Sequence, residues 1–90
     1  MSLPYKKIEK IVKGFANHRR IQILELLRKK PNLSVDDVSK NLNVGFFTIS
    51  DHLRKLADTR LVEKRYKGRF VIHNLTKRGN NILSFCKMFK

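Results

Sequence analysis

The chain has 90 residues, enough for one domain, and a formal net charge of +14 from 21 Lys and Arg against 7 Asp and Glu. A globular domain this basic most often binds a polyanion, either nucleic acid or an anionic membrane, although a merely solvated cationic surface is the alternative. The single cysteine excludes an internal disulfide and fits a reducing cytoplasm. We expect neither a signal peptide nor a membrane span, because no apolar run approaches the roughly 18 residues that a span requires.

The first third of the chain predicts two helices. Pro4 suits the first turn of a helix over 4–15, in which apolar residues recur at helical spacing. Asn17 can cap a second helix over 18–29, and Pro31 ends it. The apolar residues of this second helix cover so broad a surface that we expect it to be central and largely buried.

The middle of the chain contains the pattern on which the functional prediction depends. Ser34 can cap a short helix, and Asp37, three residues later, can complete a capping box. Asn43 tolerates the left-handed conformation that ends a helix, and Gly45 can cap the next one. A short helix, a tight turn and a second helix over about 34–58 match a helix-turn-helix, whose second helix enters the DNA major groove.

The second helix of this pair has one apolar and one polar face. Ile49, Leu53 and Leu56 lie on one apolar stripe at helical spacing. The polar residues fall largely off that stripe and are expected to face outward: Thr48, Ser50, Asp51, Arg54 and Lys55.

A basic β-hairpin and a last helix complete the predicted elements. Residues 61–66 and 70–75 are typical of strands, with Lys67-Gly68 as a tight turn, and Thr76 can cap the last helix. We expect a single domain over 1–90 that is mainly α with a small β-hairpin wing, in the order α-α-α-α-β-β-α. Its parts are the helix-turn-helix at about 34–58, the wing at about 61–75, and terminal helices at about 4–15 and 76–89.

This order of elements resembles a winged helix-turn-helix, and three segments are similar to the ArsR/SmtB-like bacterial and archaeal repressors. T48-I-S-D-H-L-R-K-L-A-D-T-R-L-V62 resembles their T-V-S-x-H-L-x-x-L-x-x-A-G-L-V run, N17-H-R-R-I-Q-I-L24 their second helix, and K67-G-R-F-V-I72 their wing. N74-L-T-K-R-G79 is also similar to the strand-to-helix junction of MarR-like regulators. The resemblance covers nearly the whole chain. It implies a dimeric, cytoplasmic, nucleoid-associated regulator that binds specific double-stranded DNA sequences.

The sequence departs from the family pattern near both ends of the second helix of the pair. Arg60 stands where the family usually has Gly, so we expect the helix to close differently there. Phe46 and Phe47 occupy a first turn that in the family often carries polar residues touching DNA, and Asp51 replaces a basic or amide residue. Phe46 and Phe47 are both candidates for contact with thymine methyl groups. Phe46 belongs alternatively to the core, and Phe47 is the more exposed of the two.

We expect no metal site, cofactor or catalytic site. The metal-sensing members of the family carry E-L-C-V-C-D-L, and the matching stretch here, N32-L-S-V-D-D-V38, has Ser34 and Asp36 in place of both cysteines. Cys86 is interpreted as an apolar interface residue rather than a redox thiol. The three histidines are interpreted as a structural His52 and isolated His18 and His73.

Candidate DNA contacts form three groups, which combine hydrogen-bond donors with positive charge. The recognition helix contributes Phe47, Thr48, Ser50, Asp51, Arg54 and Lys55; the wing contributes Lys64, Arg65, Lys67 and Arg69; and Arg19 and Arg20 open the second helix of the chain. For the recognition-helix residues, the alternative is an ordinary solvated helix face. For the wing residues, it is a charged strand edge that discourages strand pairing.

The terminal helices carry more apolar surface than a small monomer needs, which favours a homodimer. The candidate interface residues are Ile8, Ile11, Phe15, Ile82, Phe85 and Phe89. The functional prediction is therefore a homodimeric transcriptional regulator, a repressor rather than an enzyme, with DNA and a second copy as partners, no membrane partner and an unknown effector. The alternatives are a sequence-neutral architectural DNA- or RNA-binding winged helix and a protein-interaction winged helix.

Overall fold

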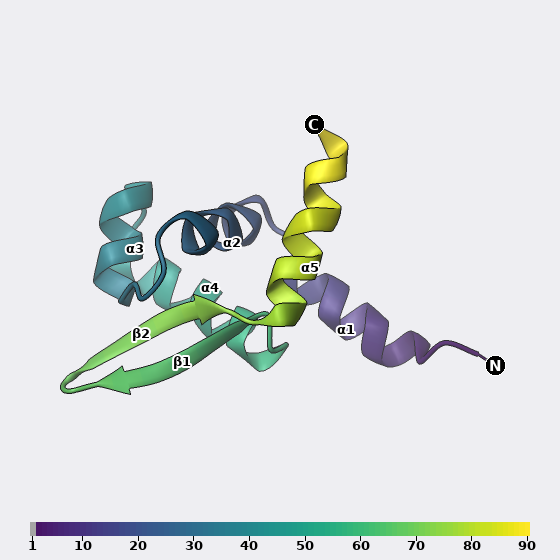
Figure 1. The fold of residues 1–90 in the computed structure, drawn as a ribbon, viewed down its shortest axis with the longest axis horizontal. Helices are drawn as coiled ribbons and strands as arrows, with labels where there is room; N and C mark the ends of the chain where they lie inside the picture. The colour runs from purple at the N-terminus through teal and green to yellow at the C-terminus, as the bar shows by residue number, and fades with distance from the viewer. Residues whose placement is uncertain (1) are drawn as a thin grey trace.

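The computed structural model describes residues 2–90, and over these residues it has five α-helices, a two-stranded antiparallel hairpin and a terminal 3-10 turn. The elements are α1 (Tyr5–Phe15), α2 (His18–Lys29), α3 (Val35–Leu42), α4 (Phe46–Asp58), β1 (Val62–Lys67), β2 (Phe70–Leu75), α5 (Lys77–Cys86) and η1 (Lys87–Phe89). This order confirms the predicted winged helix-turn-helix. The hairpin tip and α3 lie towards one end of the longest dimension, 45 Å, and α1 lies at the other end (Figure 1).

Side-chain caps start three of the helices where the sequence predicts them. Asn17 Oδ1 accepts hydrogen bonds from the backbone N–H groups of Arg19 and Arg20, at 2.9 and 3.3 Å. Ser34 and Asp37 form the predicted capping box, with bonds of 3.1 and 2.9 Å. Hydrogen bonds from Ser34 to the Asp37 carboxylate, that of the backbone N–H first, hold the pKa of Asp37 below its ordinary value. α1 begins one residue later than expected, because Pro4 is its N-cap rather than part of its first turn.

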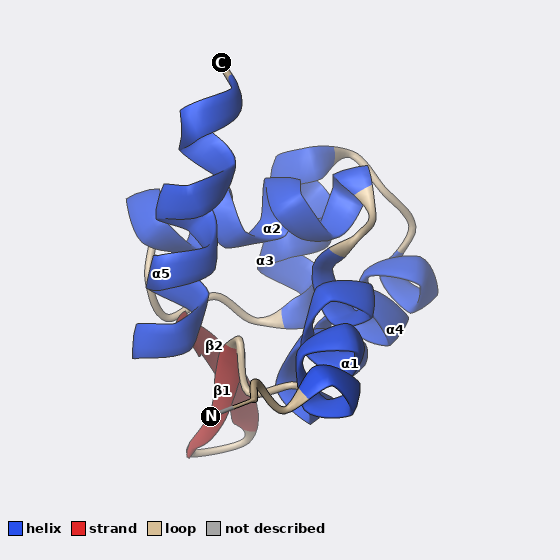
Figure 2. Ribbon diagram, turned by 90° about the vertical axis from the view of Figure 1, so that its right-hand side faces the viewer, coloured by secondary structure: helices blue, strands red, loops and turns tan. Residues whose placement is uncertain are grey.

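The core lies where α2 and α4 meet the neighbouring elements. The α4 stripe of Ile49, Leu53 and Leu56 has no exposed side-chain surface. On α2, Ile23 and Leu24 are equally buried. This helix contacts α4, α5 and β2, and Figure 2 shows it lying among the other helices. The central position of α2 is therefore confirmed, but the expectation that it is largely buried is wrong. Only Ile23, Leu24 and Leu27 are buried, and the opposite side is exposed.

The C-terminal end of α4 corrects one sequence expectation. Arg60 adopts the left-handed conformation itself, with φ +59°, so the helix closes in the geometry that Gly favours. The N–H of Leu61 bonds the carbonyl of Leu56 at 2.9 Å, and that of Arg60 bonds the carbonyl of Ala57 at 3.0 Å. This pair of bonds is a Schellman motif, which Arg accepts at a cost of about 1–2 kcal/mol relative to Gly.

The end of α4 also packs closely against α1. Thr59 is buried, and its hydroxyl lies within hydrogen-bond distance of the carbonyls of Lys55 and Leu56, at 3.2 and 3.3 Å. Gly14 faces this side chain so closely that a Cβ there would lie 2.6 Å from Thr59 Cγ2. The contact between Gly14 and Thr59 therefore requires a glycine and fixes the approach of α1 to α4.

The first strand of the wing is shifted by one residue towards the tip, because β1 runs from Val62 to Lys67 rather than from Leu61 to Tyr66. The strands pair from Val62↔Leu75 to Lys67↔Phe70, so Lys67 belongs to β1 and the two-residue turn is Gly68-Arg69. Gly68 has φ +62°, as the first central residue of a type II′ hairpin turn requires.

The base of the wing is tied to the loop that enters the helix-turn-helix. Leu33 and His73 form an isolated antiparallel bridge, with the His73 N–H donating to the Leu33 carbonyl at 2.8 Å. The amides of Asn32 and Asn74 add two bonds, of 2.7 and 2.8 Å. The wing is thus fixed to the helix-turn-helix at its base.

An added methyl group in the first turn of α5 should lower the stability of the fold. A Cβ on Gly79 would lie 2.1 Å from the carbonyl oxygen of Leu61, so α5 must shift to accept it. We expect Gly79→Ala to lower the free energy of unfolding by about 1–3 kcal/mol in urea titrations. Gly45→Ala is the matched control, because its nearest neighbour is 4.0 Å away, and it should cost less than about 1 kcal/mol. Equal losses would contradict the close contact.

The buried His73 predicts that the fold loses stability in mild acid. Only 1% of His73 is exposed, and burial lowers its pKa below the ordinary value although its Nδ1 lies 2.8 Å from the Leu33 carbonyl. The unfolded chain therefore binds a proton more readily, so the free energy of unfolding should fall as the pH drops through about 6.5. Urea titrations at pH 7.5 and 5.5 test this, and His73→Gln should show a smaller pH dependence than the wild type.

Candidate nucleic-acid interface

The outer face of α4 presents the residues predicted to meet DNA. Phe47, Asp51 and Arg54 stand at i, i+4 and i+7, on the side opposite the buried stripe. The Phe47 side chain is 86% exposed, and those of Arg54 and Asp51 are 62% and 42% exposed. Thr48 and Lys55 are exposed beside this line, whereas Ser50 is half-buried. The structure therefore brings the α4 candidates together on one accessible surface.

Asp51 organises the two cations of this surface. Its carboxylate accepts a hydrogen bond from the Arg54 guanidinium and lies 3.2 Å from Lys55 Nζ. These two bonds, that from Arg54 first, hold the pKa of Asp51 below its ordinary value. The geometry accounts for an acid on this face, because Asp51 orients Arg54 and Lys55 and offsets part of their charge.

Phe46 lies at the surface rather than in the core, so the core interpretation is wrong. Its side chain is 47% exposed, because it starts the first turn of α4 beyond the edge of the buried stripe. The rings of Phe46 and Phe47 pack edge to face, with centroids 5.6 Å apart and planes at 87°.

The wing presents cations that no acid neutralises in the described part of the chain. Lys64, Arg65, Lys67 and Arg69 are all exposed, and none forms an ion pair with a carboxylate within residues 2–90. Two exposed aromatic residues near the tip, Tyr66 at 85% and Phe70 at 68%, were missed by the sequence analysis. Only their place in a hairpin that projects from the domain makes them stand out.

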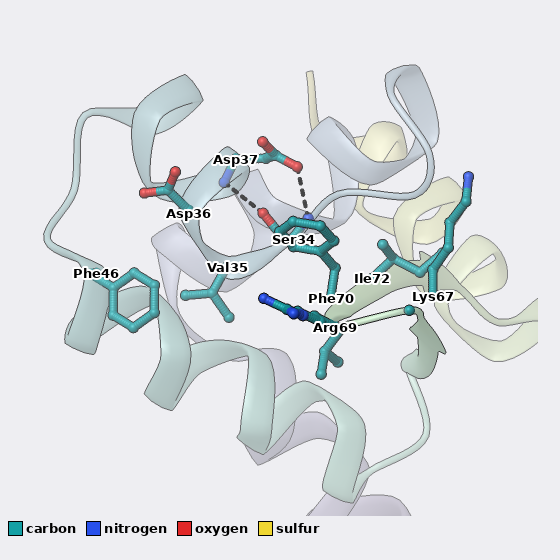
Figure 3. Close-up of a pocket in the computed structure, with 11 residues that line it drawn as sticks. Ser34, Val35, Asp36, Asp37, Phe46, Lys67, Arg69, Phe70 and Ile72 are labelled. Atoms are coloured by element: carbon teal, nitrogen blue, oxygen red, sulfur yellow. Dashed lines mark hydrogen bonds between the residues drawn. The ribbon is translucent and has the colours of Figure 1, made fainter.

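A cleft of about 860 Å³ separates the wing tip from the start of the helix-turn-helix. Figure 3 shows Phe46 and Val35 on one side of this cleft and Phe70 and Ile72 on the other. Acidic residues from the start of α3 and basic residues from the wing tip line its walls: Asp36, Asp37, Lys67 and Arg69. The sequence analysis missed this cleft, because its walls come from three separate segments.

The position of Arg20 is explained by contacts inside the protein. Its guanidinium donates to the carbonyls of Lys13 and Gly14 at 3.3 and 3.1 Å, and its Nε donates to Nδ1 of His52 at 3.1 Å. Arg20 therefore binds free carbonyls at the end of α1 and links them to α4. Burial first, and then Arg20, lower the pKa of His52, which supports its structural interpretation. Arg19 bonds Gln22 at 3.0 Å, and its phosphate contact stays a prediction.

The terminal segments of the chain expose three of the six predicted interface residues. Phe85 and Phe89 are 49% and 73% exposed, and their rings pack edge to face with centroids 5.1 Å apart. Ile8 is 38% exposed, and Ile11 and Ile82 are half-buried. Phe15 is only 7% exposed and belongs to the core of the chain itself, contrary to the prediction that it lies at the dimer interface. Exposed apolar residues that the sequence analysis omitted are Leu3, Tyr5, Val12 and Met88.

The remaining candidate chemistry is sparse. Within residues 2–90, no three His, Cys, Asp or Glu side chains come together in a group that could hold a metal ion. Burial raises the pKa of the Cys86 thiol, which favours its unreactive protonated form at neutral pH. None of the helices over these residues is both long and apolar enough to cross a membrane.

The helix-turn-helix packs one face of α4 into the core and is followed by a basic two-stranded wing. This arrangement defines a winged helix-turn-helix, a class of DNA-binding domain. Residues 17–64 match the family described as "Bacterial regulatory protein, arsR family". The chain therefore belongs to the ArsR family of bacterial regulatory proteins, which confirms the resemblance.

Known proteins are also similar to this chain. HlyU from Vibrio cholerae is 28% identical, with a TM-score of 0.83 over 99% of this chain and 97% of that one. The homodimeric winged helix-turn-helix DNA-binding domain Mb0332 from Mycobacterium bovis shares the fold, with a TM-score of 0.85, 23% identity, and coverage of 94% and 79%. The uncharacterized protein MJ0558 from Methanocaldococcus jannaschii is 30% identical over 57 residues, which are 62% of this chain and 22% of that protein. This chain therefore matches only about a fifth of the length of that relative.

The geometry predicts a division of labour between helix and wing. Arg54→Ala and Asp51→Ala should change which duplex is preferred, because these residues meet at the centre of the α4 face. Arg54→Ala should cost roughly 1–3 kcal/mol at a preferred site and less on random DNA. The double variant Lys67→Ala/Arg69→Ala should instead weaken binding to all duplexes and reduce the salt slope by about one unit per residue. Matched titrations on specific and random duplexes check this, and equal losses on both for every variant would contradict it.

Proposed function

We propose that this protein is a homodimeric regulator of transcription that binds a specific double-stranded DNA sequence. The observation that supports the proposal is the α4 surface, where an oriented Arg54 and Lys55 stand beside exposed Thr48 and Phe47 on a rigidly buried helix. The exposed cations of the wing add contacts to the phosphate backbone. Two recognition helices related by a twofold axis would address half-sites about 34 Å apart.

The proposal also covers the sense and location of regulation. A repressor is the role implied by the family resemblance, and Ser34 and Asp36 in place of the family's cysteines support regulation without a thiolate metal sensor. A protein that binds chromosomal DNA acts in the cytoplasm, at the nucleoid.

Two other functions have specific support. A formal charge of +14 also suits a sequence-neutral architectural protein that binds DNA or RNA. Phe46, Phe47 and Asp51, at positions where the resemblance leads us to expect DNA-contacting residues, favour a winged helix that binds another protein. Binding assays separate these functions, because only a regulator discriminates strongly between duplexes.

The decisive experiment selects bound duplexes from a random pool and then titrates the selected site against random DNA. A regulator should prefer the selected site by on the order of 10³-fold or more. On both duplexes, log K should fall with log salt by about 0.9 for each phosphate contact, because the wing cations release counterions. No enrichment of any sequence would favour the architectural function, and no binding even at low salt would favour the protein-binding one.

The homodimer is tested separately by light scattering at micromolar concentration. The wild type should be a dimer, and Phe85→Asp should be a monomer, because a carboxylate on this exposed ring position opposes burial against a second copy. Tyr66→Asp is the matched control: it places the same charge on the wing tip, at an 85% exposed site, and should stay dimeric. A monomeric wild type would contradict this part of the proposal. Circular dichroism distinguishes a folded monomer from an unfolded variant.

A further inference from the structure

Phe47 is an apolar side chain at the place where a recognition helix meets bases. It lies in the first turn of α4 and is 86% exposed, the highest exposure among the large apolar side chains of the described residues. The first residues of a recognition helix contact base edges in the major groove. Phe47 also stands in line with Asp51 and Arg54, so a duplex that Arg54 reaches also meets this ring.

The Phe47 ring packs against a second ring and stands on a fixed helix. Phe46 packs edge to face against it, and Figure 3 shows Phe46 beside Val35 at the mouth of the cleft. The backbone beneath both rings is fixed, because Ile49 and Leu53 of the same helix are fully buried. The ring is therefore presented from a fixed backbone position, and no backbone conformational entropy is lost when it meets a partner.

The chemistry of the ring limits what it can recognise. Phe has no hydrogen-bond donor or acceptor, and the one apolar group that a base pair presents in the major groove is the C5-methyl of thymine. The groups beside Phe47 already serve the polar edges and phosphates, since Arg54 and Lys55 carry the charge and Thr48 a hydroxyl. We propose that Phe47 determines specificity by contacting the C5-methyl group of a thymine in each half-site. This inference rests on the proposed function.

Deoxyuridine tests the contact directly, because it differs from thymidine only by the missing methyl group. In the duplex obtained by selection, each thymine is replaced in turn, and the dissociation constant of the wild-type protein is measured. Burial of one methyl-sized group predicts about fourfold weaker binding at the contacted thymine. In Phe47→Ala the same replacement should change the dissociation constant by less than about 1.5-fold, on the order of measurement error. Thr48→Ala is the matched control on the same turn, and it should keep the fourfold ratio.

The outcomes separate this inference from the proposed function. If selection enriches no sequence, the proposed function fails before the thymine test is reached, and the inference fails with it. If a site is enriched but no thymine-to-uracil ratio differs between wild type and Phe47→Ala, the inference is overturned while the regulator remains. Equal weakening of thymine and uracil duplexes by Phe47→Ala also overturns it, because the ring then acts as a wedge or a backbone contact.

Discussion

The burial of one face of α4 is the constraint on which the rest of the structure depends. Ile49, Leu53 and Leu56 are completely enclosed, and each such side chain contributes about 1.5–3 kcal/mol relative to an exposed one. A helix held this firmly cannot rotate about its axis without exposing the stripe. The opposite face, with Phe47 and Arg54, is therefore presented in one orientation. Packing on the inside thus determines the chemistry on the outside.

Charge is distributed unequally over this framework. On α4, Asp51 holds Arg54 and Lys55 in place, so the helix offers directed hydrogen-bond donors. On the wing, cations such as Lys67 and Arg69 are exposed and have no acidic partner within the described residues. Directed donors discriminate between bases, and free charges attract any phosphate. In the proposed function, one small domain thereby combines a surface that selects a DNA sequence with one that binds any DNA.

The sequence predicts what local chemistry decides. The Ser34 capping box and the left-handed Asn43 follow from neighbours in the chain, and the structure confirms both. The boundary of the wing turn and the burial of Phe15 could not be predicted, because strand pairing and tertiary packing decide them. The role of Arg20 was missed for the same reason, since His52 is 32 positions away. For the candidate site, helical periodicity placed the α4 face correctly, but not the surface position of Phe46.

The junction of α1 with α4 has a mechanical consequence. Gly14 packs against Thr59, and Arg20 joins the last carbonyls of α1 to His52 of α4, so the two helices form one rigid corner. In the proposed dimer, α1 belongs to the dimer interface and α4 to the DNA-binding surface. The fixed angle between α1 and α4 then makes the geometry of the dimer interface determine the distance between the two recognition helices. A structural change at the end of α1 would therefore alter the spacing between the two recognition helices on the operator, without a change in any residue that faces the DNA.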